Sequence, residues 1–64
     1  LIIAKNIKKY RAKLGISQGR LSKLASITLH AITKIESGST PNLIIETMTK
    51  IAKGLNISVD DLIK

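Results

Sequence analysis

The sequence predicts an all-α fold, a compact domain of five short helices, on two observations. Apolar residues recur at every third or fourth position, which places them on one face of a helix, so we expect helices rather than half-buried strands. Residues that end helices interrupt this spacing at Gly15, near Ser26, at 38–41 and at 54–58. The 64 residues are few enough for one domain, which we expect to occupy the whole chain, 1–64.

The first predicted helix precedes Gly15. Ile3, Ile7, Tyr10 and Leu14 fall within a narrow arc when residues are set about 100° apart, while the lysines of this segment lie elsewhere around the helix. We therefore expect an amphipathic helix whose apolar arc is buried.

Two short helices are predicted next, the second capped by Ser17 and the third capped by Thr28. Serine and threonine in such positions accept hydrogen bonds from the unpaired backbone N–H groups of the first turn. The residues spaced for burial on these helices are Leu21, Leu24, Ala25, Ile32 and Ile35. The opposite side and the flanks of the third helix carry His30, Ala31, Thr33, Lys34 and Ser37.

A fourth helix is predicted to begin near Asn42, and a fifth is capped by Ser58. The residues that these helices are expected to bury are Ile45, Met48, Ile51, Ala52 and Leu55 on the fourth and Val59, Leu62 and Ile63 on the fifth. Each predicted helix then has one apolar side, as helices that pack around a shared core do.

Positive charge is concentrated in the first half of the chain. Residues 1–35 contain eight lysines and arginines and no acidic residue, a charge of +8, whereas residues 36–64 carry −1. Such asymmetry predicts that one side of the domain faces a polyanion while the other has a different task, such as self-association. A basic surface that only keeps the protein in solution is the alternative that charge alone leaves open.

Composition disfavours several classes of function. Without cysteine the chain has neither disulfides nor thiolate metal sites, and its single histidine is too few for a metal cluster. The longest apolar run, residues 1–4, is too short to span a bilayer, and a membrane-surface role for the basic first helix is disfavoured because the apolar helix sides must cover one another. Asp60 and Asp61 have no nucleophile or base beside them, so we expect no enzyme, no cofactor and no small-molecule ligand.

The middle of the chain carries a recognisable pattern. Residues 17–38, SQGRLSKLASITLHAITKIESG, resemble the helix-turn-helix of the phage repressor and Cro family, also called the XRE family, and Gln18 opens the second helix as glutamine does in that family. Residues 50–63, KIAKGLNISVDDLI, are similar to the family's closing segment. The family's core spacing is matched by Leu21, Ala25, Ile27, Ile32 and Ile35. The resemblance implies a compact five-helix repressor-like domain in which the second and third helices form the helix-turn-helix.

Two residues depart from the family pattern. Ser22 lies inside the second helix where alanine is usual, and Ser26 stands in the turn where glycine is usual. If the turn keeps the family geometry, Ser26 adopts a left-handed conformation at a cost of about 1 kcal/mol. The loop after Gly38 also differs by one residue from the commonest length.

The resemblance further implies an ion pair between Arg11 in the first helix and Glu36 at the end of the third. Glu36 lies near the inward arc of its helix, where an unpaired carboxylate would be strongly destabilising. We therefore interpret this pair as structural, although a charged pair in a nucleic-acid-binding protein invites a functional interpretation.

The function implied by the resemblance is binding to double-stranded DNA, with the third helix in the major groove and the second helix across the backbone. Gln18 matches a family residue that binds a phosphate, at a helix N-terminus where the dipole also favours an anion. Lys34 can donate to guanine O6 and N7 or to a phosphate, and Thr33 can meet a base edge or a thymine methyl group. Ser39 and Thr40 follow the third helix and are candidates for phosphate contacts. The residues predicted to contact DNA are Gln18, Thr28, Leu29, His30, Ala31, Thr33, Lys34, Ser37 and Ser39.

Two of these residues have a second interpretation. Leu29 lies near the core arc of its helix, so packing is as good an explanation for it as a thymine contact. His30 could be an ordinary exposed histidine.

The resemblance thus implies a sequence-specific transcriptional regulator, a repressor-like protein of a prokaryotic cytoplasm or encoded by a phage, that binds a pseudo-palindromic operator as a homodimer. The closing segment holds more large apolar side chains than so small a core needs, so the predicted dimer interface is Leu55, Ile57, Val59, Leu62 and Ile63. The alternative is a repressor-like fold used mainly for protein docking, as in an antitoxin or an antagonist of a regulator. Sparse base-reading chemistry on the third helix keeps that alternative open.

Overall fold

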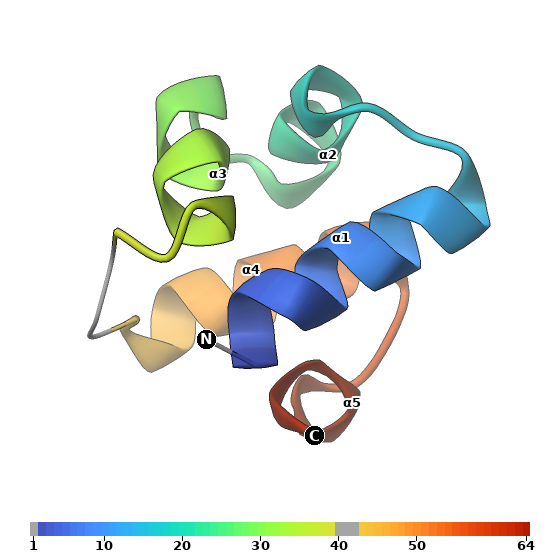
Figure 1. Ribbon diagram of the computed structural model, residues 1–64, viewed down its shortest axis with the longest axis vertical. Coiled ribbons are helices and arrows are strands. Elements are labelled where there is room, and N and C mark those ends of the chain that lie inside the picture. The colour runs from blue at the N-terminus through green and yellow to red at the C-terminus, as the bar shows by residue number, and fades with distance from the viewer. Residues whose placement is uncertain (1, 40–42) are drawn as a thin grey trace.

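The computed structural model describes residues 2–39 and 43–64, and in these ranges helices are the only regular elements (Figure 1). The five helices in chain order are α1 (Ile2–Leu14), α2 (Gln18–Ala25), α3 (Leu29–Glu36), α4 (Ile45–Leu55) and α5 (Val59–Ile63). The predicted all-α fold is therefore confirmed.

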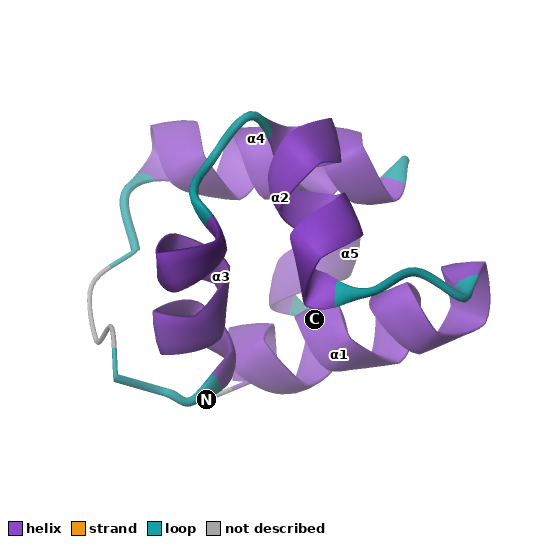
Figure 2. Ribbon diagram, turned by 90° about the horizontal axis from the view of Figure 1, so that it is seen from above, coloured by secondary structure: helices purple, strands orange, loops and turns teal. Residues whose placement is uncertain are grey.

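The helices enclose one apolar core. In Figure 1, α1 and α4 lie in the middle of the molecule, with α2 and α3 above this pair and α5 below it, and the view from above in Figure 2 shows α1 and α4 along opposite edges. Every helix contributes to the core, whose buried residues are Ile7, Leu21, Ala25, Ile32, Ile35, Ile51, Leu55 and Leu62. Burying a large aliphatic side chain stabilises a fold by about 1.5–3 kcal/mol, so this cluster is the main source of stability.

Three of the connections between helices have the same construction, a left-handed residue, an isoleucine and a hydroxyl cap. These connections are Gly15-Ile16-Ser17, Ser26-Ile27-Thr28 and Asn56-Ile57-Ser58. The N–H of each isoleucine donates to a carbonyl five residues earlier at 2.9–3.1 Å, which satisfies the end of the preceding helix. Each isoleucine also packs against the core.

The third residue of each connection caps the next helix. The hydroxyls of Ser17, Thr28 and Ser58 accept from backbone N–H groups in the first turns of α2, α3 and α5. All three caps are the ones predicted from the sequence, Ser17 for the second helix, Thr28 for the third and Ser58 for the fifth. The first positions in the connections have φ angles of 67°, 57° and 59°, so Ser26 adopts the left-handed conformation that the sequence predicted for it.

Four residues that were predicted to be buried are exposed instead. Leu14 lies at the last residue of α1, Ile45 at the first of α4 and Ile63 at the last of α5, beyond the neighbours that could cover them. Leu24 is 45% exposed because the buried face of α2 includes Ser22 instead. The hydroxyl of Ser22 donates to the carbonyl of Gly19 at 2.7 Å, so its burial leaves no unpaired polar group.

The start of the fourth helix was also predicted wrongly. Asn42 lies outside the described residues, but α4 begins at Ile45, after Ile44 in extended conformation. Leu43 precedes the helix and packs against the core, whereas Ile45 is exposed.

Two residues of the predicted dimer interface lie inside the single chain. Leu55 and Leu62 are members of the buried core and have almost no accessible surface. Leu62 is also fixed through its backbone, whose carbonyl accepts from the Asn6 side chain at 2.7 Å. The prediction was wrong for these two residues because one chain covers them fully, so they have no surface to offer a partner.

Candidate nucleic-acid interface

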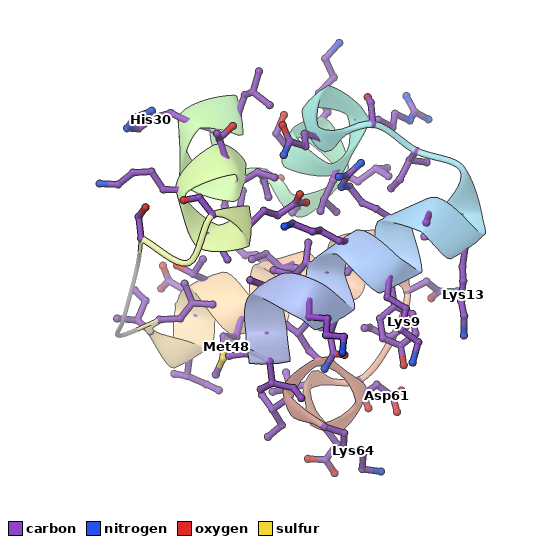
Figure 3. All side chains as sticks on the ribbon, in the orientation of Figure 1. Lys9, Lys13, His30, Met48, Asp61 and Lys64 are labelled. Carbon is purple, nitrogen blue, oxygen red and sulfur yellow. The ribbon has the colours of Figure 1, made fainter. Side chains whose placement is uncertain are left out.

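The helix pair α2–α3 presents one polar face to solvent. The buried side of α3 consists of Ile32, Ile35 and Glu36. The residues exposed on or just after this helix are Leu29, His30, Thr33, Lys34, Ser37 and Ser39. His30 projects from the end of the molecule opposite α5 (Figure 3). An exposed helix face of this size fits the major groove of duplex DNA.

An ion pair connects the buried side of α3 to α1. Nε of Arg11 donates to Oε2 of Glu36 at 2.7 Å, and Nη2 donates to Oε1 at 3.0 Å, so the predicted pair is present and has two parallel hydrogen bonds. Nη1 of Arg11 donates to the carbonyl of Ile16 at 3.0 Å. Arg11 therefore ties α1 both to the end of α3 and to the connection that leads into α2.

Gln18 completes this network. Its side-chain amide donates to Oε1 of Glu36 at 3.0 Å, a contact that sequence analysis did not anticipate. An amide nitrogen has two hydrogens, so one hydrogen and the amide oxygen of Gln18 stay available at the N-terminus of α2. In the described part of the chain every buried side-chain nitrogen and oxygen has a hydrogen-bond partner.

The network keeps Glu36 charged although its side chain is only 3% exposed. Burial is the largest influence on this carboxyl and alone would raise its pKa. Hydrogen bonds from Arg11 and Gln18, together with the charges of Arg11 and Lys8, outweigh burial and lower the pKa of Glu36. The hydrogen bond to Glu36 in turn raises the pKa of Arg11.

Lys8 belongs to this surface although it was not among the predicted residues. It lines a shallow hollow of about 230 Å³ together with Gln18, Thr33, Glu36 and Ser37, so residues of α1, α2 and α3 meet there. Lys8 brings a positive charge to the hollow that Gln18 also lines. The available signal was its position one turn before Arg11, which puts both residues on the same side of α1.

The hydroxyl groups of α3 make bonds within their own segment. Oγ1 of Thr33 donates to the carbonyl of Leu29 at 2.9 Å, and Oγ of Ser37 donates to the carbonyl of Lys34 at 2.8 Å. The hydroxyls of Ser37 and Ser39 lie 2.8 Å apart. With its proton used in this way, Thr33 is better suited to an apolar contact through its methyl group than to donation toward a phosphate.

Two further hollows flank the first turns of α2 and α3. One, of about 560 Å³, is lined by Leu29 beside Arg20 and Lys23 of α2, so a leucine expected near the core lies among positive charges at the surface. The other, of about 250 Å³, brings His30 and Lys34 together with Thr47 of α4. Thr28 and Ala31 line this second hollow as well. Thr40, the other candidate for a phosphate contact after α3, lies outside the described residues.

Not all of the N-terminal positive charge lies on this surface. Lys9 and Lys13 project from the α5 side of α1, away from His30 (Figure 3). Their ammonium groups lie 5.6 and 5.4 Å from the centre of the Tyr10 ring, within the range of cation–π attraction. The charge of the first half of the chain is therefore divided between two sides of the domain.

The described residues contain no group of three side chains that could hold a metal ion. Within the same ranges, none of the helices combines the length and the apolar character needed to cross a membrane.

Comparison with protein families decides what kind of domain this is. A family model described as helix-turn-helix matches residues 7–62, which include parts or all of the five helices. The chain belongs to the helix-turn-helix family. No curated protein and no solved structure matches it. The helix-turn-helix domain is a DNA-binding regulator of the XRE type, a family that is not typically enzymatic.

Proposed function

We propose that this helix-turn-helix domain is a sequence-specific transcriptional regulator that binds a pseudo-palindromic operator as a homodimer, with α3 of each subunit in the major groove of one half-site. The observation that carries the proposal is the exposed polar face of α3, supported from below by the ion pair of Arg11 and Glu36. A helix that is held rigidly at its inner face can present side chains to base edges in a fixed register.

The proposed contacts divide into two kinds. Phosphates are bound by Gln18, Lys8 and Ser39, because these donors surround the N-terminus of α2 and the end of α3. Bases are read by the exposed residues of α3, above all by the charged Lys34, which can donate to guanine. The remaining proposed contacts are Thr28, Leu29, His30, Ala31, Thr33 and Ser37.

The proposed dimer uses the C-terminal part of the chain, but with fewer residues than the sequence predicted. Val59 is half-buried and Ile63 is exposed, so both still have apolar surface to bury. Ile57 packs against the core and lines the groove between α2 and α4, which makes it a weaker candidate. A two-fold dimer would present two copies of α3 to a two-fold symmetric operator.

Selection from a pool of random duplexes tests this function. We expect enrichment of one short sequence that occurs twice, in inverted orientation, with the two half-sites about one helical turn apart or a multiple of it. A pool that stays random after repeated rounds, or an enriched sequence without inverted repetition, would contradict the proposal.

A further inference from the structure

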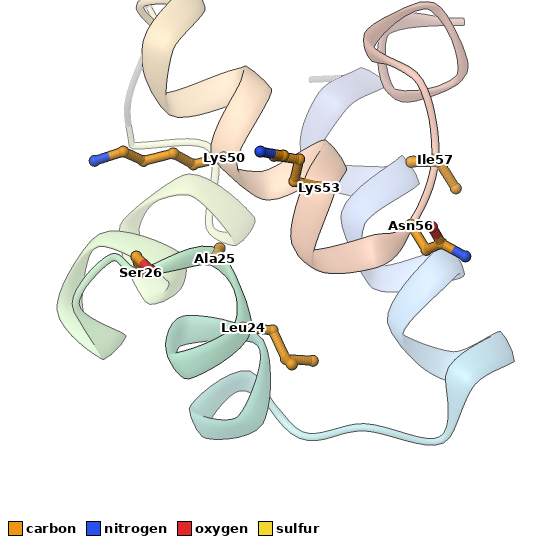
Figure 4. A pocket seen from close by; sticks show the side chains of 7 residues that line it. All are labelled: Leu24, Ala25, Ser26, Lys50, Lys53, Asn56 and Ile57. Atoms are coloured by element: carbon orange, nitrogen blue, oxygen red, sulfur yellow. The ribbon is translucent and has the colours of Figure 1, made fainter.

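A groove between α2 and α4 lies outside the surface assigned to DNA. It has a volume of about 590 Å³, and Figure 4 shows its lining side chains. None of the residues that line it belongs to the proposed DNA contacts or to the predicted dimer interface except Ile57.

The apolar part of the groove lining is Leu24, Ala25 and Ile57, and Leu24 leaves 45% of its surface exposed. Ser26 and Asn56 also line the groove, and Asn56 lies between Leu24 and Ile57 (Figure 4). The two helices cross closely beside the groove, because a Cβ on Gly54 would lie 3.1 Å from both the Cβ and the backbone nitrogen of Ala25. α2 and α4 are therefore closely packed at this point, while Leu24 beside it stays exposed.

One edge of the groove is positively charged. Lys50 and Lys53 project from α4 along this edge, while Leu24 and Ala25 lie on the opposite side (Figure 4). The two lysines are three residues apart and therefore lie on adjacent turns of one helix face. No acidic side chain lines the groove, and the described residues form no ion pair with either lysine.

We propose that this groove docks an acidic amphipathic helix of another protein. An aliphatic side chain of the partner would cover Leu24 and Ile57, and carboxylates one turn apart would meet Lys50 and Lys53. Burial of the aliphatic groups supplies affinity, while the lysines select an acidic partner over a basic one. The proposal does not depend on the operator or on the dimer.

Other occupants fit the groove less well. A nucleic acid backbone would satisfy the lysines but would leave the apolar part of the lining uncovered. A second copy of this chain could offer the acidic helix α5, but Asp60 and Asp61 are adjacent in sequence rather than one turn apart. Oδ2 of Asp61 also accepts from the backbone N–H of Ser58 in its own helix cap.

The test is a titration of the isotope-labelled protein, followed by NMR, with a synthetic peptide of about 15 residues that has leucines on one face and glutamates one turn apart beside them. A second peptide with lysine in place of each glutamate is the matched control. We expect the acidic peptide to shift the backbone resonances of Leu24, Ala25, Lys53 and Ile57 and the basic peptide to leave them unchanged. The absence of shifts at the groove up to about 1 mM acidic peptide would overturn the proposal.

Three variants sharpen the test. Leu24→Ser should weaken peptide binding roughly tenfold or more, because an exposed contact of that size is lost, while DNA binding and the melting temperature stay close to those of the wild type. Leu29→Ser removes an equally exposed leucine from α3 and should leave peptide binding unchanged. The double variant Lys50→Glu/Lys53→Glu should reverse the preference, so that the basic peptide binds better than the acidic one.

Three results would contradict this account. Equal affinity of Leu24→Ser and wild type for the acidic peptide would show that the groove is not the site. Loss of peptide binding in Leu29→Ser would move the site to α3. Shifts of the groove resonances with protein concentration alone would assign the groove to a second copy of the chain.

Discussion

The first residue of α2 and the last residue of α3 are joined by a side-chain hydrogen bond, from the amide of Gln18 to Oε1 of Glu36 at 3.0 Å. At the opposite ends of the same two helices, the connection Ser26-Ile27-Thr28 joins the last residue of α2 to the first of α3. The helix pair is thus closed at both ends, which fixes the angle between its two helices. Arg11 adds a third support from α1.

Removal of the Glu36 carboxylate should weaken the attachment of α3 to α1 and α2. We expect Glu36→Ala to lower the free energy of unfolding by about 1–3 kcal/mol, because Arg11 and Gln18 lose their shared acceptor. Thermal unfolding followed by circular dichroism measures this loss. An unchanged melting temperature would show that the pair contributes nothing to stability.

The same carboxylate predicts a pH dependence. The pKa of Glu36 is lowered in the folded protein, so as the pH falls the unfolded state takes up this proton first. The stability contributed by the pair is therefore complete above about pH 5 and is lost as the pH falls through the folded-state pKa. The difference in unfolding free energy between wild type and Glu36→Gln should be constant from about pH 5 to 8 and shrink below about pH 4. A difference that does not change with pH would contradict this assignment.

Because Ser26 has a left-handed backbone conformation, we expect that glycine at this position stabilises the protein. Ser26→Gly should raise the free energy of unfolding by about 0.5–1 kcal/mol, because glycine adopts the φ of 57° without the strain of a side chain. Asn56→Gly is the matched control at a φ of 59° and should gain less, since asparagine tolerates this conformation. Equal gains for the two variants, measured by urea unfolding, would show that Ser26 is not strained.

The proposed dimer is tested at Ile63 rather than at Leu62. Ile63→Lys places a charge on exposed surface and should give a folded monomer with weakened operator binding. Leu62→Lys serves as the comparison and should unfold the single chain, because that side chain is completely buried. Sedimentation that finds the Ile63 variant still dimeric would move the interface elsewhere.

Gln18 and Lys34 are assigned different contacts with DNA. Gln18→Ala removes a neutral phosphate contact together with the hydrogen bond to Glu36, so it should weaken binding to all sequences by a similar factor and also lower the melting temperature. Lys34→Ala should cost about 1–3 kcal/mol on the best operator and relax the preference at one base pair of each half-site. Affinities for the operator and its single-base variants distinguish the two effects. A uniform loss for Lys34→Ala would reassign this lysine to a phosphate.

Sequence patterns predicted the features that depend on local order along the chain. The helix type and the caps Ser17, Thr28 and Ser58 each follow from a few neighbouring residues, whereas the left-handed Ser26 followed from the turn geometry that the family resemblance implies. The ion pair of Arg11 and Glu36, which joins distant segments, followed from a family resemblance rather than from local pattern.

Features that depend on how helices meet could not be predicted in this way. Leu24 has the spacing of a buried residue, but the close approach of Gly54 to Ala25 turns the buried face of α2 toward Ser22. The hydrogen bond from Gln18 to Glu36 could be predicted only if the angle between α2 and α3 were known. Lys8 lines the same hollow as Gln18 and Thr33 because three helices pack around it, and this arrangement cannot be read from the sequence around Lys8.

The most direct test of the central claim, that the face built on α3 binds duplex DNA, is the salt dependence of affinity for the selected operator. The logarithm of the wild-type binding constant should fall steeply and linearly with the logarithm of salt concentration, as phosphates neutralised by the protein release counterions. Lys8→Gln should reduce that slope by about one unit per subunit, whereas Lys13→Gln, on the α5 side of α1, should leave it unchanged. A wild-type affinity independent of salt, or a slope reduced by Lys13→Gln and not by Lys8→Gln, would contradict the claim.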